Sequence, residues 1–155
     1  MNRSNWSMAY GGFTLIELLV VLIIMAVLAA QAMPAYQQHV IRTRRGEAHA
    51  ALLKLMMQQE RYHTQTNTYI AFSVGATDPE ARHFQWWSGS RAPESAYEIE
   101  GKACEGELIS ECVQLIATPG TGQVDSTFRD DDCRKLTLTS TGLRLASGPA
   151  TGCWP

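Results

Sequence analysis

One carboxylate stands alone in the most apolar part of this chain. Glu17 is the only ionisable residue between Phe13 and Ala30. A charged carboxylate at the centre of a bilayer costs about 2.5–3.5 kcal/mol on insertion scales, so such a residue is retained where a partner compensates it. Glu17 therefore predicts an ion pair formed in apolar surroundings. The alternative is a carboxylate that snorkels from a plain membrane anchor.

Four cysteines form a second reactive set, and all of them follow the apolar run. They are Cys104, Cys112, Cys133 and Cys153. An even number confined to one side of an apolar segment predicts two disulfides formed in an oxidising compartment. A zinc site is disfavoured because the chain has neither a Cys-x-x-Cys pair nor a histidine at ligand spacing from a cysteine. Three pairings are open at this point.

A third candidate site is an aromatic and cationic stretch. Trp86 and Trp87 lie between Arg82 and Arg91. Aromatic rings between cations could stack single-stranded bases or contact a receptor. The tryptophans could instead anchor the loop on a sheet, which is the interpretation that we favour.

Catalytic machinery is not evident elsewhere in the sequence. The four histidines have no fixed partner, and no phosphate loop or nucleophile motif is present. We expect no enzyme activity, no cofactor and no metal, and we interpret the run of aspartates at 130–132 as a solvated turn. The chain has 13 Lys and Arg against 15 Asp and Glu, a net charge of -2. This balance argues against nucleic-acid binding by bulk charge alone.

The apolar run has the length of a membrane-spanning helix. Phe13 to Met33 covers 21 residues, and at about 1.5 Å per residue such a helix crosses roughly 30 Å of hydrocarbon. Pro34 is expected to kink it, because proline lacks an N–H group. Helical sequence resumes and runs from Glu47 to about His63, so we interpret the whole as one long kinked helix. The apolar stripe of its second half predicts burial against a soluble domain: Ala48, Ala51, Leu52, Leu55, Met56, Gln59 and Tyr62.

Short runs with β character fill the last third of the chain. They predict strands at 97–100, 112–117, 136–140 and 143–146, and Thr141-Gly142 is typical of a hairpin turn. Residues 64–94 have no sustained period and predict a long surface loop. We therefore expect an α+β fold, in which the long helix packs on a small antiparallel sheet of about four strands.

The segment Gly-Phe-Thr-Leu-Ile-Glu-Leu, residues 12–18, follows a short polar leader. It resembles the processing motif of class III signal peptides, which is found in type IV pilin-like proteins. The resemblance continues through Pro34, the amphipathic helix and residues 59–69. The ending, with a hairpin and Cys153-Trp154-Pro155, is most similar to PilE-type pilins, including small minor pilins.

This resemblance implies three segments and one processing step. Residues 1–12 would be a leader removed by prepilin peptidase, which cuts between Gly12 and Phe13 and N-methylates Phe13. Residues 13–33 would form a transmembrane helix that later lies in the filament core. Residues 34–155 would form the soluble head with the second half of the helix. Glu17 would be the assembly residue, neutralising the Phe13 amine of a neighbouring subunit.

The resemblance also implies a function, partners and a location. The function would be that of a structural subunit, a minor pilin that contributes to pilus assembly, adhesion or twitching motility. The alternatives are a filament-borne DNA-uptake or surface receptor and a type II secretion pseudopilin. The partners would be other pilin subunits, the prepilin peptidase, the inner-membrane assembly platform, the lipid bilayer before assembly and, for a receptor, DNA. The chain would cross the inner membrane once with a periplasmic C-terminus, and would be extracellular after assembly.

Two further expectations depend on the same resemblance. Arginines 42, 44 and 45 outnumber Arg3 at the other end of the apolar run, which by the positive-inside rule alone would place the C-terminus in the cytoplasm. The cysteines and the resemblance argue the reverse, and we follow them. Among the disulfide pairings we favour Cys104–Cys112 and Cys133–Cys153, both local in sequence. The loop closed by Cys133–Cys153 resembles the D-region loop of pilins.

Overall fold

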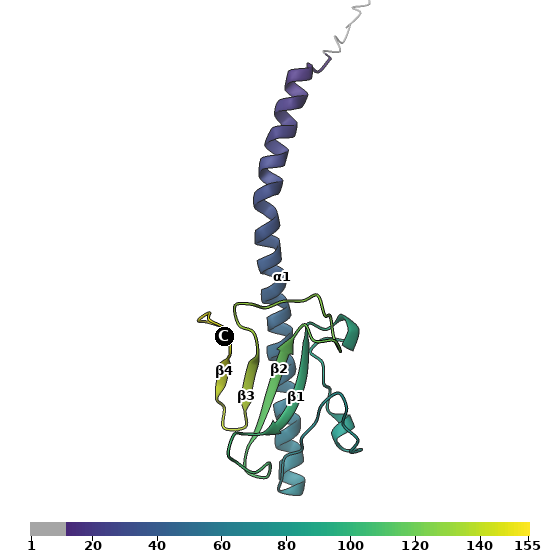
Figure 1. The fold of residues 1–155 in the computed structure, drawn as a ribbon, viewed down its shortest axis with the longest axis vertical. Helices are drawn as coiled ribbons and strands as arrows, with labels where there is room; N and C mark the ends of the chain where they lie inside the picture. Colours follow the sequence, from purple (N-terminus) through teal and green to yellow (C-terminus); the bar gives the residue numbers. More distant parts are fainter. Residues whose placement is uncertain (1–11) are drawn as a thin grey trace, which may run out of the picture. The chain divides into compact units, whose positions relative to one another are not determined.

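The computed structural model describes residues 12–155, except for the side chains at positions 32, 34 and 35. The expected leader lies outside the described residues apart from Gly12. One helix, two short 3-10 helices and one four-stranded antiparallel sheet make up the fold (Figure 1). The predicted α+β fold is confirmed. The elements are α1 (Leu15–Thr66), η1 (Ala81–His83), η2 (Ala92–Glu94), β1 (Tyr97–Ala103), β2 (Val113–Pro119), β3 (Leu136–Thr139) and β4 (Arg144–Ala146).

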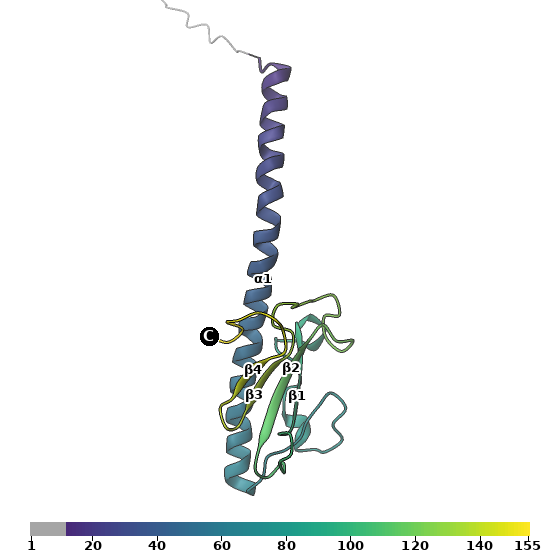
Figure 2. The same cartoon turned by 60° about the vertical axis from the view of Figure 1, so that its left-hand side comes forward.

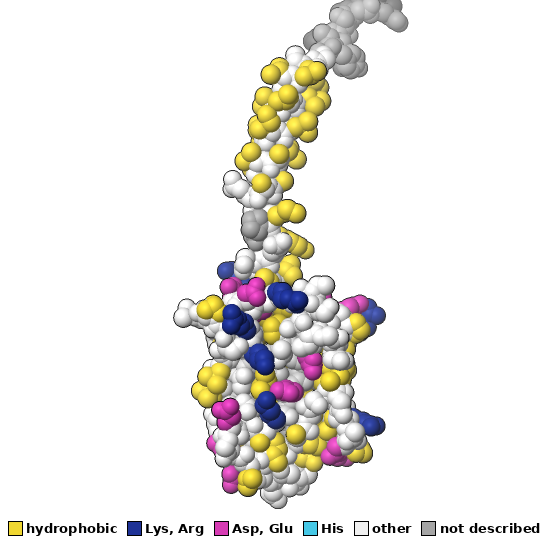
Figure 3. Space-filling model, viewed as in Figure 1, with side chains coloured by type: hydrophobic (Ala, Val, Ile, Leu, Met, Phe, Trp, Pro, Cys, Tyr) yellow, Lys and Arg dark blue, Asp and Glu magenta, His cyan; other side chains and the backbone are white. Residues whose placement is uncertain are grey.

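Two compact units divide the chain, residues 1–39 and residues 40–155. The described part of the first is the start of α1, which holds an 18-residue window of mean hydropathy 2.6 with none of its residues buried. By length and composition this helix could cross a membrane, and apolar side chains cover its visible face (Figure 3). The helix is continuous through position 34. The kink expected at Pro34 stays a prediction.

In the second unit, the remainder of α1 lies along one face of the sheet, as two views show (Figures 1 and 2). The stripe that the sequence predicted is the buried one: Ala48, Leu52 and Gln59 are fully buried, and Leu55 is nearly so. Burial of apolar surface contributes about 25 cal/mol per Å², so this helix is held mainly by its contact with the sheet. The sheet side of the core is formed by Tyr97, Ile99, Val113, Leu115, Ala117, Leu136 and Leu138.

The strands follow one another in sequence order, β1-β2-β3-β4, and each pairs with the next in antiparallel fashion. Buried and partly exposed residues alternate along the first two strands. This is the period-2 pattern of a sheet with one face on a core and one face in solvent. The hairpin between β3 and β4 turns at Gly142, whose φ of 83° is readily adopted only without a Cβ atom.

The free edge of β1 is covered by the long loop that precedes it. Phe72 exchanges two backbone hydrogen bonds with Gly101, of 3.0 and 2.9 Å. Farther along, the amide of Ile99 donates to the carbonyl of Trp86 at 2.7 Å. A Cβ atom at position 101 would lie 2.5 Å from the Phe72 ring, so glycine is required for this close approach. The loop thus satisfies backbone groups that an open edge would expose.

Candidate functional site

The residues of the processing motif lie at the N-terminal end of α1. Phe13 is 82% exposed. The hydroxyl of Thr14 accepts a hydrogen bond from the amide of Glu17 at 3.3 Å. Thr14 is therefore the N-cap, and Glu17 occupies the third helical position, as in a capping box. A carboxylate there is also favoured by the helix dipole.

Glu17 forms no salt bridge within residues 12–155. Its backbone amide is satisfied by Thr14 of the same chain, whereas the ionic partner expected for its carboxylate is not supplied within these residues. A Cβ atom added at Gly12 would have no described group within 4 Å. The backbone at the expected cleavage position is therefore open on the described side.

Both disulfides have the pairing that we favoured. Cys104 is bonded to Cys112, and Cys133 is bonded to Cys153. The first closes the connection between β1 and β2, and we call residues 104–112 the knob. The second joins Cys133 to Cys153, and we call residues 130–155, which contain this bond, the tail loop. Glu107 lies within 4.8 Å of the sulfur atoms of the knob, but these sulfurs are bonded to each other and offer no thiolate ligand.

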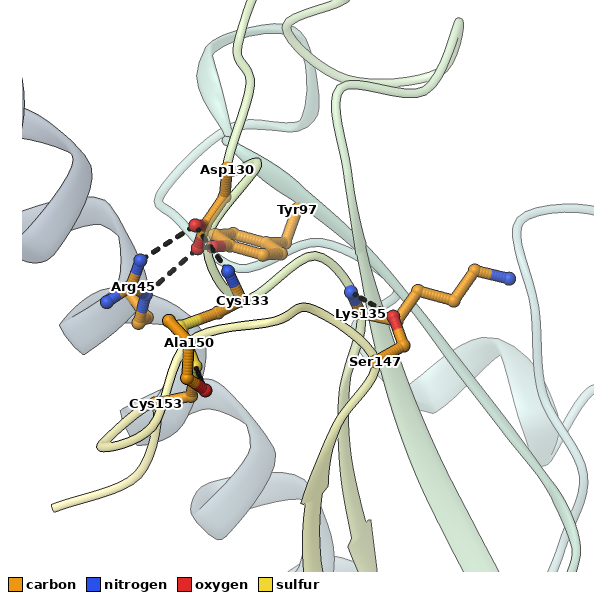
Figure 4. Close-up of polar contacts among 8 residues, drawn as sticks. All are labelled: Arg45, Tyr97, Asp130, Cys133, Lys135, Ser147, Ala150 and Cys153. Atoms are coloured by element: carbon orange, nitrogen blue, oxygen red, sulfur yellow. Dashed lines mark hydrogen bonds and ion pairs between the residues drawn. A yellow bond between two sulfur atoms is a disulfide. The ribbon is translucent and has the colours of Figure 1, made fainter.

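A buried ion pair fastens the tail loop to α1 (Figure 4). Arg45 makes a two-pronged contact with Asp130, at 2.9 Å from Nε to Oδ2 and 2.7 Å from Nη2 to Oδ1. The Tyr97 hydroxyl donates to the same carboxylate at 2.5 Å, and the Cys133 amide donates to it at 3.1 Å. The Asp130 side chain is fully buried, and all its acceptor positions are used. Our expectation of a solvated turn at 130–132 is therefore wrong for Asp130.

This arrangement sets the protonation of its members. Burial raises the pKa of the Asp130 carboxyl, but hydrogen bonds from Arg45, Tyr97 and the Cys133 amide outweigh it and leave the pKa lowered. The hydrogen bond to Asp130 raises the pKa of Arg45. Burial, followed by the bond to Asp130, strongly raises the pKa of the Tyr97 hydroxyl. The pair is therefore ionised and the phenol neutral across the physiological range.

The C-terminal residues pack on the same part of α1. The Trp154 ring stacks on the His49 ring with 4.5 Å between centroids, and its Nε1 donates to the Leu145 carbonyl at 2.8 Å. The Arg144 guanidinium lies 5.8 Å from the centre of the Trp154 ring. Burial lowers the pKa of His49. The tail loop is thus closed by a disulfide and also packed against the helix.

The loop at 82–91 is bound to the sheet more than it is presented to solvent. Trp86 and Trp87 are half-buried, and their rings meet edge to face with 5.0 Å between centroids. Trp87 forms a backbone bridge with Glu98 of β1, and its Nε1 atom is buried. This geometry agrees with the anchoring role that we favoured. The flanking cations are also engaged, because Arg82 donates to the Ala76 carbonyl and Arg91 forms a salt bridge with Glu94.

The hairpin holds a second set of cations that the sequence did not single out. Arg134 and Lys135, just before β3, and Arg144 of β4 are all exposed, and none of them is in a salt bridge within the described part of the chain. Arg144 also donates to the Pro155 carbonyl at 3.3 Å, so Arg134 and Lys135 are the more available pair. In Figure 4 the Lys135 side chain extends away from the buried ion pair. Lys and Arg side chains form a broken line down the sheet face, with Asp and Glu between them (Figure 3). The surface offers local cationic positions without an overall positive charge.

Comparison with known proteins identifies the class to which this chain belongs. Residues 7–30 match the prokaryotic N-terminal methylation motif. Residues 34–137, about two thirds of the chain, match the family described as "Type IV minor pilin ComP, DNA uptake sequence receptor". The chain belongs to this family of type IV minor pilins.

Individual relatives are more distant. The fimbrial protein EcpC of Eikenella corrodens is 57% identical over 37 residues, and the match spans 24% of each chain. A type IV pilin from Shewanella oneidensis is similar in structure, with 23% identity and a TM-score of 0.46, over 74% of this chain and 98% of that one. The non-core minor pilin PilV of Neisseria meningitidis has 21% identity and a TM-score of 0.48, over 74% and 94%.

Proposed function

We propose that this minor pilin is a DNA receptor of a type IV pilus. The observation that carries the proposal is the extent of the family match, which runs through the head as far as the start of β3 and so concerns more than the N-terminal helix that pilins share. The alternative that we set out from the sequence, a filament-borne receptor for DNA uptake, is thus favoured over a purely structural subunit. The pseudopilin alternative is not pursued.

The hairpin cations are the best placed to bind DNA. Phosphate contacts by Lys and Arg supply most of the affinity of proteins for DNA, and they do not depend on base sequence. Arg134, Lys135 and Arg144 are exposed on a hairpin that the Cys133–Cys153 disulfide holds in place. A rigid scaffold reduces the entropy lost on binding. The half-buried tryptophans at 86 and 87 are less suited, because base stacking needs an open ring face.

The test is DNA binding by the purified full chain in detergent, measured by fluorescence anisotropy with a labelled duplex. Arg134→Glu together with Lys135→Glu should weaken binding about tenfold or more and flatten its dependence on salt. Arg82→Glu together with Arg91→Glu is the matched control, with the same change of charge, and should have a smaller effect. Equal losses in both variants would contradict the hairpin as the binding surface, and no binding by the unaltered chain would contradict the receptor function.

We further propose that the chain is processed and assembled as its motif implies. Prepilin peptidase would cut between Gly12 and Phe13 and methylate the new amine, and the disulfides support a C-terminal region outside the cytoplasm. Glu17 would then pair with the Phe13 amine of a neighbouring pilin. Mass spectrometry of the mature N-terminus tests the cut. Glu17→Gln, which keeps the side-chain size but removes the charge, should abolish incorporation into filaments, whereas normal incorporation would refute the pairing.

A further inference from the structure

The knob is a rigid acidic projection with an apolar tip. Its disulfide is supported by backbone hydrogen bonds, including those from Cys104 to the Cys112 carbonyl at 3.2 Å and from Glu111 to the Leu108 carbonyl at 2.9 Å. Leu108 is 67% exposed at its tip. Three glutamates of the knob flank it in sequence, all of them exposed and none in a salt bridge within residues 12–155. They are Glu105, Glu107 and Glu111.

The outer face of α1 has the opposite character. Two adjoining hollows of about 430 and 520 Å³ lie between this face and residues 80–90, and both are lined by Lys54, Gln58 and His83. A hydrogen bond of 3.2 Å from the Gln58 amide to the His83 carbonyl crosses between them. We call this pair of hollows the α1 groove. It lies wholly within the second unit of the chain.

An exposed apolar residue flanked by cations marks the first of the two hollows. Met57 is 66% exposed. Lys54 and Arg61 lie three residues before it and four after it, so all three share one face of the helix. The two cations are seven residues apart, which is about 10 Å along the axis. Both are exposed and neither is in a salt bridge among the described residues. One acid lines each hollow, Glu80 the first and Glu47 the second, and Glu47 is paired with Arg44.

The two surfaces are complementary in charge and in apolar character. The knob presents Leu108 between carboxylates, and the α1 groove presents Met57 between cations. The knob is fixed by a covalent bond, so little entropy is lost in ordering it. We propose that the knob of one copy docks into the α1 groove of a second copy, with Leu108 against Met57. This contact is separate from DNA binding and does not depend on it.

Such a contact joins two different surfaces of the same chain. It is therefore heterologous, and after one contact forms, one copy keeps a free groove and the other copy keeps a free knob. A heterologous contact that does not close into a ring propagates as an open helical array. The knob contact would thus add a junction between heads to whatever the N-terminal helices contribute to a filament.

Site-specific photocrosslinking tests the contact directly. The full chain is purified in detergent with the photoreactive residue p-benzoylphenylalanine in place of Leu108, and the crosslinked peptides are mapped by mass spectrometry. The expected product joins position 108 of one copy to residues 53–61 of another. Lys54→Glu with Arg61→Glu should lower its yield about fivefold. Glu107→Lys with Glu111→Lys, added to that variant, should restore the yield.

The intact mass of each variant, measured without reductant, serves as the check on folding, because both disulfides must be present. Arg134→Glu with Lys135→Glu is the matched charge control, which should leave the crosslink unchanged while it weakens DNA binding. The two proposals can therefore fail separately. Crosslinks that are absent, that map elsewhere on the second copy, or that are not restored by the second charge reversal would overturn the proposal.

Discussion

The two segments that carry the disulfides differ in the further contacts that hold each of them to the rest of the fold. The tail loop is fastened to α1 by the buried Arg45–Asp130 pair and by the stack of Trp154 on His49. The knob has no comparable fastening within the described residues. It meets the end of α1 through a 3.3 Å contact between the His63 ring and the Ser110 carbonyl. The Tyr69 amide donates to the Ile109 carbonyl at 3.4 Å, and Ile109 packs against the core. The charged side chains of the knob are all exposed.

The tail loop is therefore a segment that stabilises the fold, whereas the knob is a segment that presents side chains to solvent. Surface substitutions away from caps, cores and buried networks change stability by about 0.5 kcal/mol or less, whereas breaking a buried pair costs several times more. The tail loop should therefore respond to substitution by unfolding, and the knob by loss of contacts. The changes in the free energy of unfolding refer to denaturant unfolding of the full chain in detergent, followed by tryptophan fluorescence.

The largest effect is expected where the tail loop meets α1. Asp130→Ala would leave the Arg45 guanidinium buried without its partner, and would also free the Tyr97 hydroxyl and the Cys133 amide. We expect the free energy of unfolding to fall by about 3–5 kcal/mol. Glu107→Ala in the knob is the matched control and should change it by about 0.5 kcal/mol or less. Similar losses in both variants would contradict the distinction between the segments.

The disulfides themselves should rank in the same order. Their cysteines are 20 residues apart in the tail loop and eight apart in the knob. The chain-entropy model gives about 3 kcal/mol for the longer loop and about 2.5 kcal/mol for the shorter one. Cys133→Ser with Cys153→Ser should therefore cost more than Cys104→Ser with Cys112→Ser. Cys133 and Cys153 are both buried, whereas of the knob pair only Cys112 is. A reversed order would show that the tail loop is held independently of its disulfide.

A smaller effect is expected at the last aromatic residue. Trp154→Ala removes the stack on His49, the contact with Arg144 and the hydrogen bond to the Leu145 carbonyl. We expect a loss of about 2 kcal/mol in the free energy of unfolding. Trp154→Phe keeps an aromatic ring but cannot donate the hydrogen bond, and it should lose about half as much. Equal losses would assign the whole effect to the hydrogen bond.

The ion pair should also give the tail loop an acid-sensitive component of stability. The pKa of Asp130 is lowered in the folded chain, so its contribution is complete above the unfolded value of about 3.9 and is lost as pH falls through the folded value. Melting temperatures of the unaltered chain should therefore drop with acid more steeply than those of Asp130→Asn. Parallel curves from about pH 7 to about pH 2 would mean that the carboxylate does not carry this dependence.

Sequence periodicity predicted the parts of the fold that repeat, and it failed where single residues meet across a distance. The stripe from Ala48 to Gln59 and the alternation at Tyr97–Glu100 are visible in sequence because neighbouring residues share one environment. Asp130 sits in a run of three aspartates that is typical of a solvated turn. Its partner Arg45 is 85 residues away, and no spacing rule connects them.

The candidate surfaces show the same limit. Arg82 and Arg91 were conspicuous because they flank aromatic residues, yet they are engaged locally by Ala76 and Glu94. The cations of the hairpin and of α1 are present in the sequence, but no aromatic residue or motif beside them indicated a binding role. Only the folded chain shows which charges remain available.

The smallest effect on stability, and the sharpest test of the comparison, is expected at the tip of the knob. Leu108 is 67% exposed, so Leu108→Ser removes little buried area and should change the free energy of unfolding by about 0.5 kcal/mol or less. Its proposed role is in the contact between two copies, so the substitution should clearly weaken that contact. With a photoreactive residue placed at Met57, Leu108→Ser should reduce crosslinking between copies severalfold, because the apolar side chain that the knob presents among its glutamates is gone. A variant that loses stability but keeps its crosslinks would reverse the roles of the two segments, and would make the knob a stabilising element like the tail loop.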